Sequence, residues 1–274
     1  MKNWVWIVLI LLVVVLSVYV FLFNFEKKST GNVISNPGLL LYYTFEGNLK
    51  DYSGNSLDLI NEQELIFDSG VIGQSIRLEG NEALILPYID KLNTPDDLSV
   101  SLWVKKQESA YPNPVFVSKR YWQNSGWFFG VNEKTNVPVF QISDGTKYLA
   151  VPFGVAIRNN EWYHLAFVLN KGKFKAYING QLVREDSKTL PPQIIPNLKP
   201  ILIGKNQEND NNYFNGLMDE VKIYNRPLSD QEINKIFQNS NVNSTGTIEK
   251  PKITQKYTTL DSNQKKSFFG SLFG

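Results

Sequence analysis

The chain of 274 residues contains no cysteine, which excludes both a disulfide framework and a thiolate metal site. It has one histidine, His164, so a histidine-rich metal centre is excluded and a catalytic triad would have to use this residue. A strong charge of either sign is also lacking, because the formal net charge of +2 does not give the basic footprint of a nucleic-acid-binding protein. An exported domain of this composition must be stabilised by its hydrophobic core, alone or with a bound metal.

A long hydrophobic run lies at the N-terminus, where residues 4–23 read WVWIVLILLVVVLSVYVFLF. About 20 apolar residues span the hydrocarbon core of a bilayer. The core of a signal peptide has roughly 7–15 residues and precedes a cleavage site of small residues, whereas the sequence NFEKK follows here. We therefore predict an uncleaved transmembrane helix over residues 1–25; the alternative is a buried core helix.

Between this run and Ser229 the sequence shows short strand-like runs separated by turn signals, without a long helical period. In residues 98–105, Leu and Val alternate with Ser, Ser, Trp and Lys, as in a strand with one buried face. Asn179-Gly180 is a strong hairpin signal, because both residues tolerate positive φ. These patterns predict an all-β antiparallel sandwich.

Composition divides the rest of the chain. We predict a polar stalk over residues 26–38, a single domain over residues 39–239, and a disordered tail over residues 240–274, where Asn, Ser, Thr, Lys and Gln dominate. Asn243-Ser244-Thr245 in the tail is a glycosylation sequon, so Asn243 is a candidate modification site.

The segment that closes the domain, residues 216–233, reads GLMDEVKIYNRPLSDQEI. Its first half alternates as a strand does. The residues predicted to share one face are Leu217, Asp219, Val221 and Ile223. After a proline turn, Ser229 and Glu232 have the spacing of a capping box, which predicts a short helix of one to two turns.

Three further segments support the same interpretation: YYTFEGNLKDYSGNSLDL (42–59), SVSLWVKK (99–106) and WYHLAFVLNKGKFKAYINGQLV (162–183). Together with the closing segment, and in this order, they resemble the laminin G-like, concanavalin A-like lectin/glucanase domains. The sequence departs from that family at LEGNEALILP (78–87), where a Phe-Asp-Gly turn is common.

The resemblance implies a two-sheet antiparallel jelly-roll sandwich, here preceded by one transmembrane helix and followed by a short helix and the disordered tail. Domains of this family usually lie outside cells. We therefore expect a single-pass protein of the cell membrane with its N-terminus inside and its domain facing outside.

The resemblance also implies a structural calcium site, since many relatives bind this ion. The ligands that it implies here are Asp51, Asn55 and Asp219, with Glu46 as a fourth. Calcium takes oxygen ligands of these kinds, and an acidic side chain on a buried face needs to be neutralised. The alternative is that Asp219 accepts hydrogen bonds from loop amides.

Aromatic residues in the loop RYWQNSGWFF are candidates for stacking on sugar rings, with flanking polar groups as hydrogen-bond partners. The candidate ligand contacts are Arg120, Tyr121, Trp122 and Asn124. The alternative is a hairpin that its own side chains cover. Tyr111 and Tyr148 lie on other candidate loops, whereas Trp103, Trp127 and Trp162 are expected to pack in the core, and His164 is expected to be structural.

Hydrolysis of glycosides requires two carboxylates at a set separation, and on one strand these would stand two or four residues apart so that they face the same side. The sequence contains no E-x-D-x-E pattern. The leading hypothesis is therefore a non-catalytic, membrane-anchored adhesion module of the cell surface that recognises glycans or glycosylated proteins. The alternatives are a structural envelope or assembly protein that uses the sandwich for protein contacts and, third, a glycoside hydrolase.

Overall fold

The computed structural model describes residues 36–61, 63–87, 92, 96–120, 125–144, 148–187, 199–206 and 212–242. The predicted anchor, nearly all of the predicted stalk, Asn243 and residues 243–274 of the predicted tail lie outside these ranges. None of the helices in these ranges is long and apolar enough to cross a membrane.

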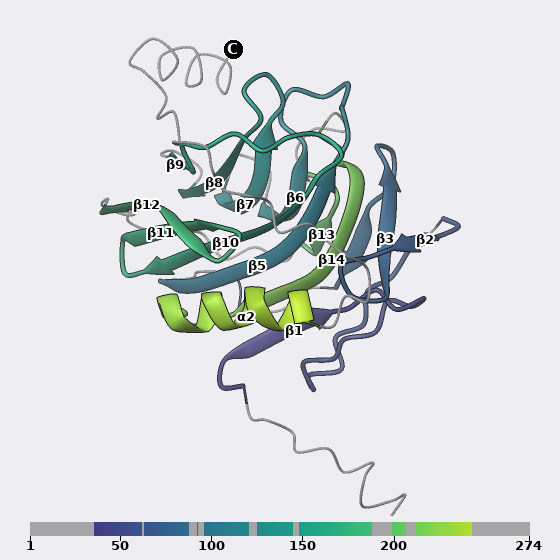
Figure 1. The fold of residues 1–274 in the computed structure, drawn as a ribbon, viewed down its shortest axis with the longest axis horizontal. Helices are drawn as coiled ribbons and strands as arrows, with labels where there is room; N and C mark the ends of the chain where they lie inside the picture. The colour runs from purple at the N-terminus through teal and green to yellow at the C-terminus, as the bar shows by residue number, and fades with distance from the viewer. Residues whose placement is uncertain are drawn as a thin grey trace, which may run out of the picture. The chain divides into compact units, whose positions relative to one another are not determined.

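In the described residues, fourteen strands form two antiparallel sheets, as the sequence predicts (Figure 1). The strands are β1 (Leu39–Tyr43), β2 (Ile66–Ser69), β3 (Gln74–Glu79), β4 (Leu84–Leu86), β5 (Asp97–Lys106), β6 (Val115–Arg120), β7 (Ser125–Asn132), β8 (Val137–Asp144), β9 (Tyr148–Pro152), β10 (Trp162–Asn170), β11 (Lys173–Ile178), β12 (Gln181–Ser187), β13 (Ile201–Ile203) and β14 (Asn215–Tyr224). One helix, α2 (Asp230–Val242), follows them.

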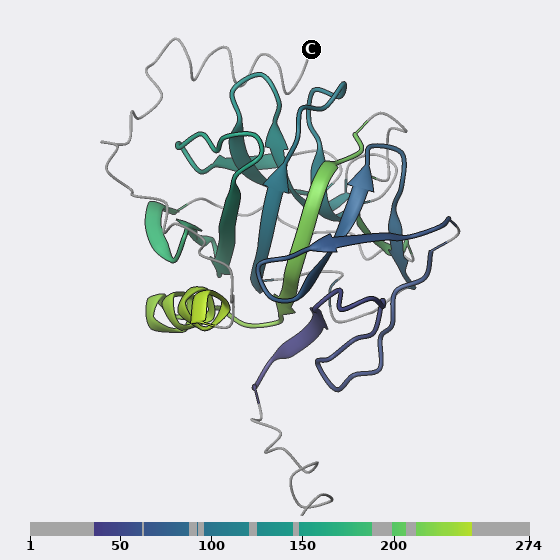
Figure 2. The same cartoon turned by 45° about the vertical axis from the view of Figure 1, so that its right-hand side comes forward.

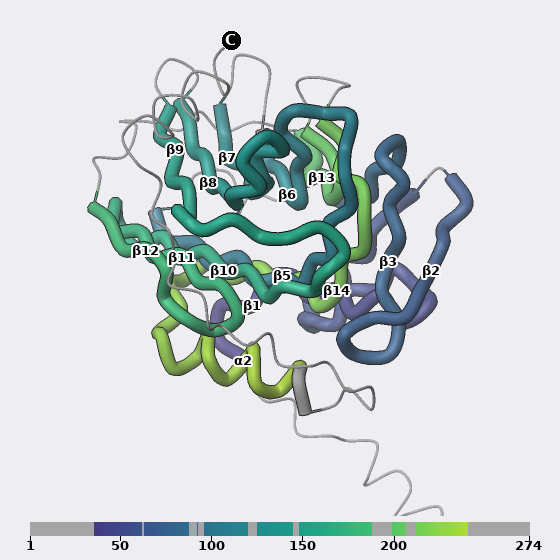
Figure 3. The backbone as a smooth tube through the Cα atoms, turned by 45° about the horizontal axis from the view of Figure 1, so that its top comes forward, coloured from purple at the N-terminus to yellow at the C-terminus, as the bar shows by residue number. Residues whose placement is uncertain are grey.

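The larger sheet has the order β12-β11-β10-β5-β14-β3-β2, with β1 paired to β14 beside this path, and the smaller has the order β4-β13-β6-β7-β8-β9. In Figure 3 the strand labels of the larger sheet follow this order from left to right, with strands of the smaller sheet above them. Such non-consecutive neighbours in two facing antiparallel sheets fit the jelly roll that the resemblance implies.

The core lies between the two sheets. Leu98, Val100, Leu102 and Val104 of β5 all belong to it, so the predicted alternation of that strand is confirmed. Phe140 of β8 stacks on Phe167 of β10, with ring centroids 3.8 Å apart and an interplanar angle of 7°, and thereby joins the two sheets directly.

The predicted faces of β14 are wrong beyond Asp219. A β-bulge interrupts the pairing with β5 between Asp219 and Lys222, and Glu220 has φ of 53°. The extra residue reverses the alternation, so Met218 before the bulge and Val221 after it both face the core. The bulge also divides one edge of the strand, because β14 pairs with β3 up to Met218 and with β1 from Val221.

Helix α2 lies against the larger sheet on the side away from the smaller one, as Figures 1 and 2 show. The predicted capping box is present: Ser229 Oγ accepts a hydrogen bond from Glu232 N, and Glu232 accepts one from Ser229 N. The helix is longer than one to two turns because its apolar face continues; Ile233 is fully buried and Phe237 stacks on Trp103.

The Asn179-Gly180 turn between β11 and β12 is confirmed, with φ of 52° and 74°. Gly180 is needed for a second reason as well. A Cβ atom at this position would lie 2.9 Å from the Phe237 ring, so the absence of a side chain lets α2 approach the sheet.

The docking of α2 gives a prediction about stability. Replacing the buried Ile233 by alanine leaves a cavity under the helix, and we expect a loss of about 2–5 kcal/mol in the free energy of unfolding. The matched control is Asn234→Ala, one residue further on the exposed side, which we expect to change stability by less than about 0.5 kcal/mol. Urea unfolding followed by circular dichroism measures both; similar values for the two variants would show that α2 is not docked.

Candidate functional site

Two carboxylates accept hydrogen bonds from the tight turn that joins β2 to β3. Asp219 Oδ2 accepts hydrogen bonds from Val71 N (2.8 Å) and Ile72 N (3.1 Å). On the other side of the turn, Glu46 accepts a hydrogen bond from Gln74 N (3.1 Å). A Cβ atom at Gly73 would collide with the Glu46 carboxylate, so the turn needs glycine there. Glu46 and Asp219, both predicted calcium ligands, therefore flank one turn.

One carboxylate oxygen of Asp219 lacks a hydrogen-bond partner among the described residues. The side chain is fully buried, and the unpartnered atom is its Oδ1. The pKa of Asp219 is raised to about 8, because burial and the nearby charge of Glu220 outweigh the opposite effect of the backbone amides of Ile72, Val71 and Glu220. The alternative that loop amides hold Asp219 is thus true of its Oδ2.

The other two predicted calcium ligands fasten the D-x-S-G-N loop to β1. Asp51 Oδ1 accepts hydrogen bonds from Tyr42 N and Ser53 N, and its Oδ2 accepts from Leu57 N and the Ser53 hydroxyl. Asn55 Nδ2 donates to the carbonyl of Leu40. Both side chains therefore already have a role in holding the loop. Within the ranges that the structure describes, no group of three or more His, Asp or Glu side chains is placed to hold a metal.

Glu220, next to Asp219, is neutralised by its neighbours. It accepts a hydrogen bond from the Tyr42 hydroxyl (2.8 Å) and forms an ion pair with Lys222. The Lys222 ammonium also lies over the Tyr42 ring, 4.2 Å from its centroid. Through these contacts the Glu220 carboxylate links β1, which carries Tyr42, to β14.

His164 is a buried structural residue. Its Nε2 lies 2.9 Å from the Ser101 hydroxyl, and its backbone N donates to Asn179 Oδ1. Burial lowers the pKa of His164 to about 3, and the positive charge of Lys222 contributes in the same direction. The ring packs beside Trp103 and Phe237 and is inaccessible to a substrate.

The predicted ligand loop lies at the tip of the β6–β7 hairpin. The backbones of Arg120 and Gly126 pair across its base. Tyr121, Trp122 and Asn124, and the side chain of Arg120, lie outside what the structure describes. Of the tryptophans expected in the core, Trp103 and Trp127 are buried, as predicted, but Trp162 at the start of β10 is only partly buried.

A pair of tyrosines lies at the opposite end of β6, where two loops meet. The ring of Tyr111, from the β5–β6 loop, and the ring of Tyr213, from the β13–β14 loop, have centroids 5.9 Å apart at an interplanar angle of 46°. Both side chains are partly exposed. The Lys205 ammonium lies 4.6 Å from the Tyr213 ring centroid. The sequence pointed to Tyr111 only as a loop residue and gave no signal for its pairing with Tyr213.

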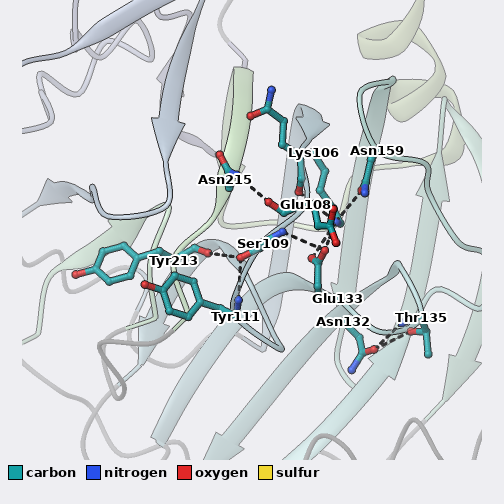
Figure 4. Close-up of polar contacts among 11 residues, drawn as sticks. Lys106, Glu108, Ser109, Tyr111, Asn132, Glu133, Thr135, Asn159, Tyr213 and Asn215 are labelled. Atoms are coloured by element: carbon teal, nitrogen blue, oxygen red, sulfur yellow. Dashed lines mark hydrogen bonds and ion pairs between the residues drawn. The ribbon is translucent and has the colours of Figure 1, made fainter.

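A buried ion pair supports these loops (Figure 4). Lys106 is 1% exposed, and its ammonium contacts the Glu133 carboxylate and Asn159 Oδ1, each at 2.8 Å. Glu133 also accepts a hydrogen bond from Ser109 N. Since the ammonium is paired and hydrogen-bonded in a buried place, the β5–β6 loop is fixed at its base.

A family model described as the concanavalin A-like lectin/glucanases superfamily matches residues 78–234. No curated protein sequence matches the chain.

Among solved structures, domain 4 of AbnA, a GH43 extracellular arabinanase from Geobacillus stearothermophilus, was determined in complex with arabinotriose. It is 22% identical, with a TM-score of 0.60 over 73% of this chain and 98% of that one. The binding domain of Paraclostridial Mosquitocidal Protein 1 is 21% identical, with a TM-score of 0.60 over 74% of this chain.

The ligand binding domain of botulinum neurotoxin serotype D, determined in complex with N-acetylneuraminic acid, is 20% identical, with a TM-score of 0.60 over 74% of this chain. This chain spans about half the length of the two toxin domains, 52% and 51% respectively. At these identities the similarity shows the fold.

The burial of His164 gives a prediction about pH. The unfolded chain takes up a proton at this residue below about pH 6.5, whereas the folded chain resists it down to about pH 3. The folded state therefore loses stability as the pH falls from 7 to 5, by about 2 kcal/mol from this residue. In His164→Gln this loss should be smaller by that amount, measured by urea unfolding at both pH values; equal losses would contradict it.

Proposed function

Because the chain belongs to the concanavalin A-like lectin/glucanase superfamily, we propose that it is a non-catalytic module that binds glycans or glycosylated partners at the cell surface. The observation that carries this proposal is the correspondence with a domain bound to arabinotriose, which this fold covers over 98% of its length. A toxin domain of the same fold bound to N-acetylneuraminic acid supports the same class of ligand.

In this proposal the β6–β7 hairpin contributes to the sugar contacts. The rings of Tyr121 and Trp122 provide flat apolar faces, and Arg120 and Asn124 provide hydrogen bonds to sugar hydroxyls. The pairing of β6 with β7 and of β7 with β8 supports this role, since it gives the loop a rigid base.

Three carboxylates that are engaged within the fold support binding over hydrolysis. A glycosidase needs an acid and a second carboxylate that both face the scissile bond. Glu220 is paired with Lys222 and Tyr42, Glu133 is paired with Lys106, and Asp219 lies buried under the β2–β3 turn. Each of these groups is held by contacts within the domain, and none of the three is free to face a substrate.

The proposed place of the domain is the outer surface of the cell membrane. Residues 1–25 would form a single-pass anchor with the N-terminus inside, and residues 26–38 a stalk. Asn243 would be available to a glycosylation system outside the cell. An anchored module of this kind would act in adhesion, with a glycan or a cell-surface protein as its partner.

We also propose a structural calcium ion at the β2–β3 turn. The support is the buried Asp219 Oδ1, which has no hydrogen-bond partner among the described residues, together with the Glu46 carboxylate on the other side of the turn. Backbone carbonyls would complete the coordination, as they do in many calcium sites. The ion would fix the turn and neutralise Asp219; Asp51 and Asn55 would support it by holding the adjacent loop.

Glycan binding is tested with the full-length chain in a zwitterionic detergent that has no sugar headgroup. We expect binding to a printed array of neutral and sialylated oligosaccharides, and we expect Trp122→Ala to weaken it about tenfold because a stacking surface is lost. The matched control is Trp162→Ala at the start of β10, which we expect to bind as the wild type does. No binding of the wild type to any oligosaccharide would refute the proposal.

The calcium proposal predicts a change in thermal stability. At a free calcium concentration of about 100 times Kd, binding adds about 2.7 kcal/mol, so the melting temperature should rise by about 5–10 °C above its value in EDTA. Asp219→Asn should abolish this rise, whereas Glu161→Gln, which changes an exposed carboxylate paired with Arg158, should retain it. A wild-type melting temperature that is the same in calcium and in EDTA would rule the site out.

A further inference from the structure

The tyrosine pair beside the start of β6 forms a partly exposed aromatic surface. Tyr111 and Tyr213 are partly exposed, and Figure 4 shows both rings projecting to the same side, away from the Lys106–Glu133 pair. In the part of the chain that the structure describes, no hydrogen bond engages either phenol hydroxyl. The two rings, at an interplanar angle of 46°, form a shallow surface that carries the two phenol hydroxyls at its edge.

Hydrogen bonds within the chain hold this surface in place. The Ser109 hydroxyl accepts a hydrogen bond from Tyr111 N and contacts the carbonyl of Tyr213, so it joins the two loops. Ser109 N in turn donates to Glu133, which the buried Lys106 holds. A preformed site loses less conformational entropy on binding than a flexible one.

A cation lies beside the rings. The Lys205 ammonium is 4.6 Å from the centroid of the Tyr213 ring. Asn132, at the end of β7, is buried and donates a hydrogen bond to Asn113, which lies two residues after Tyr111, so this pair helps to hold the loop that carries Tyr111. Aromatic rings beside an ammonium suit a ligand with one apolar face and a rim of hydroxyls.

We propose that Tyr111 and Tyr213 form a sugar-stacking site that is separate from the β6–β7 hairpin; this inference rests on the proposed glycan-binding function. Its ligand is a pyranose ring, whose C–H face packs on the tyrosines while its hydroxyls reach the Lys205 ammonium. A protein partner fits less well, because a stable interface covers about 800 Å² on each partner, far more than two rings.

The two sites lie at opposite ends of β6, since Tyr111 precedes the strand and residues 121–124 follow it. Six residues of extended chain span about 20 Å. One monosaccharide therefore cannot touch both sites, but an oligosaccharide or two branches of one glycan can. Two weak sites linked in this way give a combined affinity well above that of either.

The alternative is that the tyrosines only cover the core. Phe214, next to Tyr213, is fully buried and packs edge-on against Phe116. A covering residue needs apolar volume but no flat ring, whereas a stacking residue needs the ring. Tyr111→Leu separates the two roles, because it keeps most of the volume and removes the ring.

The test uses the full-length chain, in the same sugar-free detergent, titrated on the printed array of neutral and sialylated oligosaccharides. We expect Tyr111→Leu and Tyr213→Ala each to weaken binding about tenfold. Tyr111→Phe should bind within about twofold of the wild type, since it keeps the ring. The matched control is Tyr52→Ala, which removes another exposed tyrosine (53% exposed) and should bind normally.

Circular dichroism melting confirms that each variant is folded. Wild-type binding that Tyr111→Leu and Tyr213→Ala leave unchanged, but that Trp122→Ala weakens, would overturn this inference and leave the proposed function intact. A wild type that binds no oligosaccharide would overturn both. Loss of binding in Tyr213→Ala through misfolding is recognised by its melting curve, and the folded Tyr111→Leu then decides the question.

Discussion

Strand β14 is the constraint on which the arrangement of the larger sheet depends. It pairs with β5 along one edge. Along its other edge it pairs with β3 before the bulge and with β1 after it. One strand therefore joins three others, and Glu220 must adopt a positive φ to make the change of partner possible. The same bulge directs Asp219 towards the β2–β3 turn and Glu220 towards Tyr42. The backbone geometry of β14 therefore sets the positions of these two buried carboxyl groups.

The molecule has two regions of different chemical character. The region around β14 and the β2–β3 turn is held by carboxylates that accept hydrogen bonds from backbone amides and from Tyr42. The loops at the base of β6 are held by the Lys106–Glu133 pair and expose aromatic rings instead. The first region stabilises the fold, and the second offers a surface that a ligand can reach.

Local signals in the sequence predicted local structure correctly. The alternation of β5, the Asn179-Gly180 turn and the Ser229–Glu232 capping box each need only a few neighbouring residues, and each was confirmed. The faces of β14 were not predictable, because nothing in the sequence marks a bulge at a glutamate. Among the site residues, the pairing of Tyr111 with Tyr213 depends on two distant loops that only the folded sheets bring together.

The place of β14 in the chain affects how the domain is made. The strand that joins β1, β3 and β5 is also the last of the described strands to be synthesised. Until it leaves the ribosome, three earlier strands have edges that nothing covers, and such edges are prone to pair wrongly. The larger sheet therefore forms late and through contacts that are distant in sequence, which makes folding slow and a holding chaperone useful during synthesis.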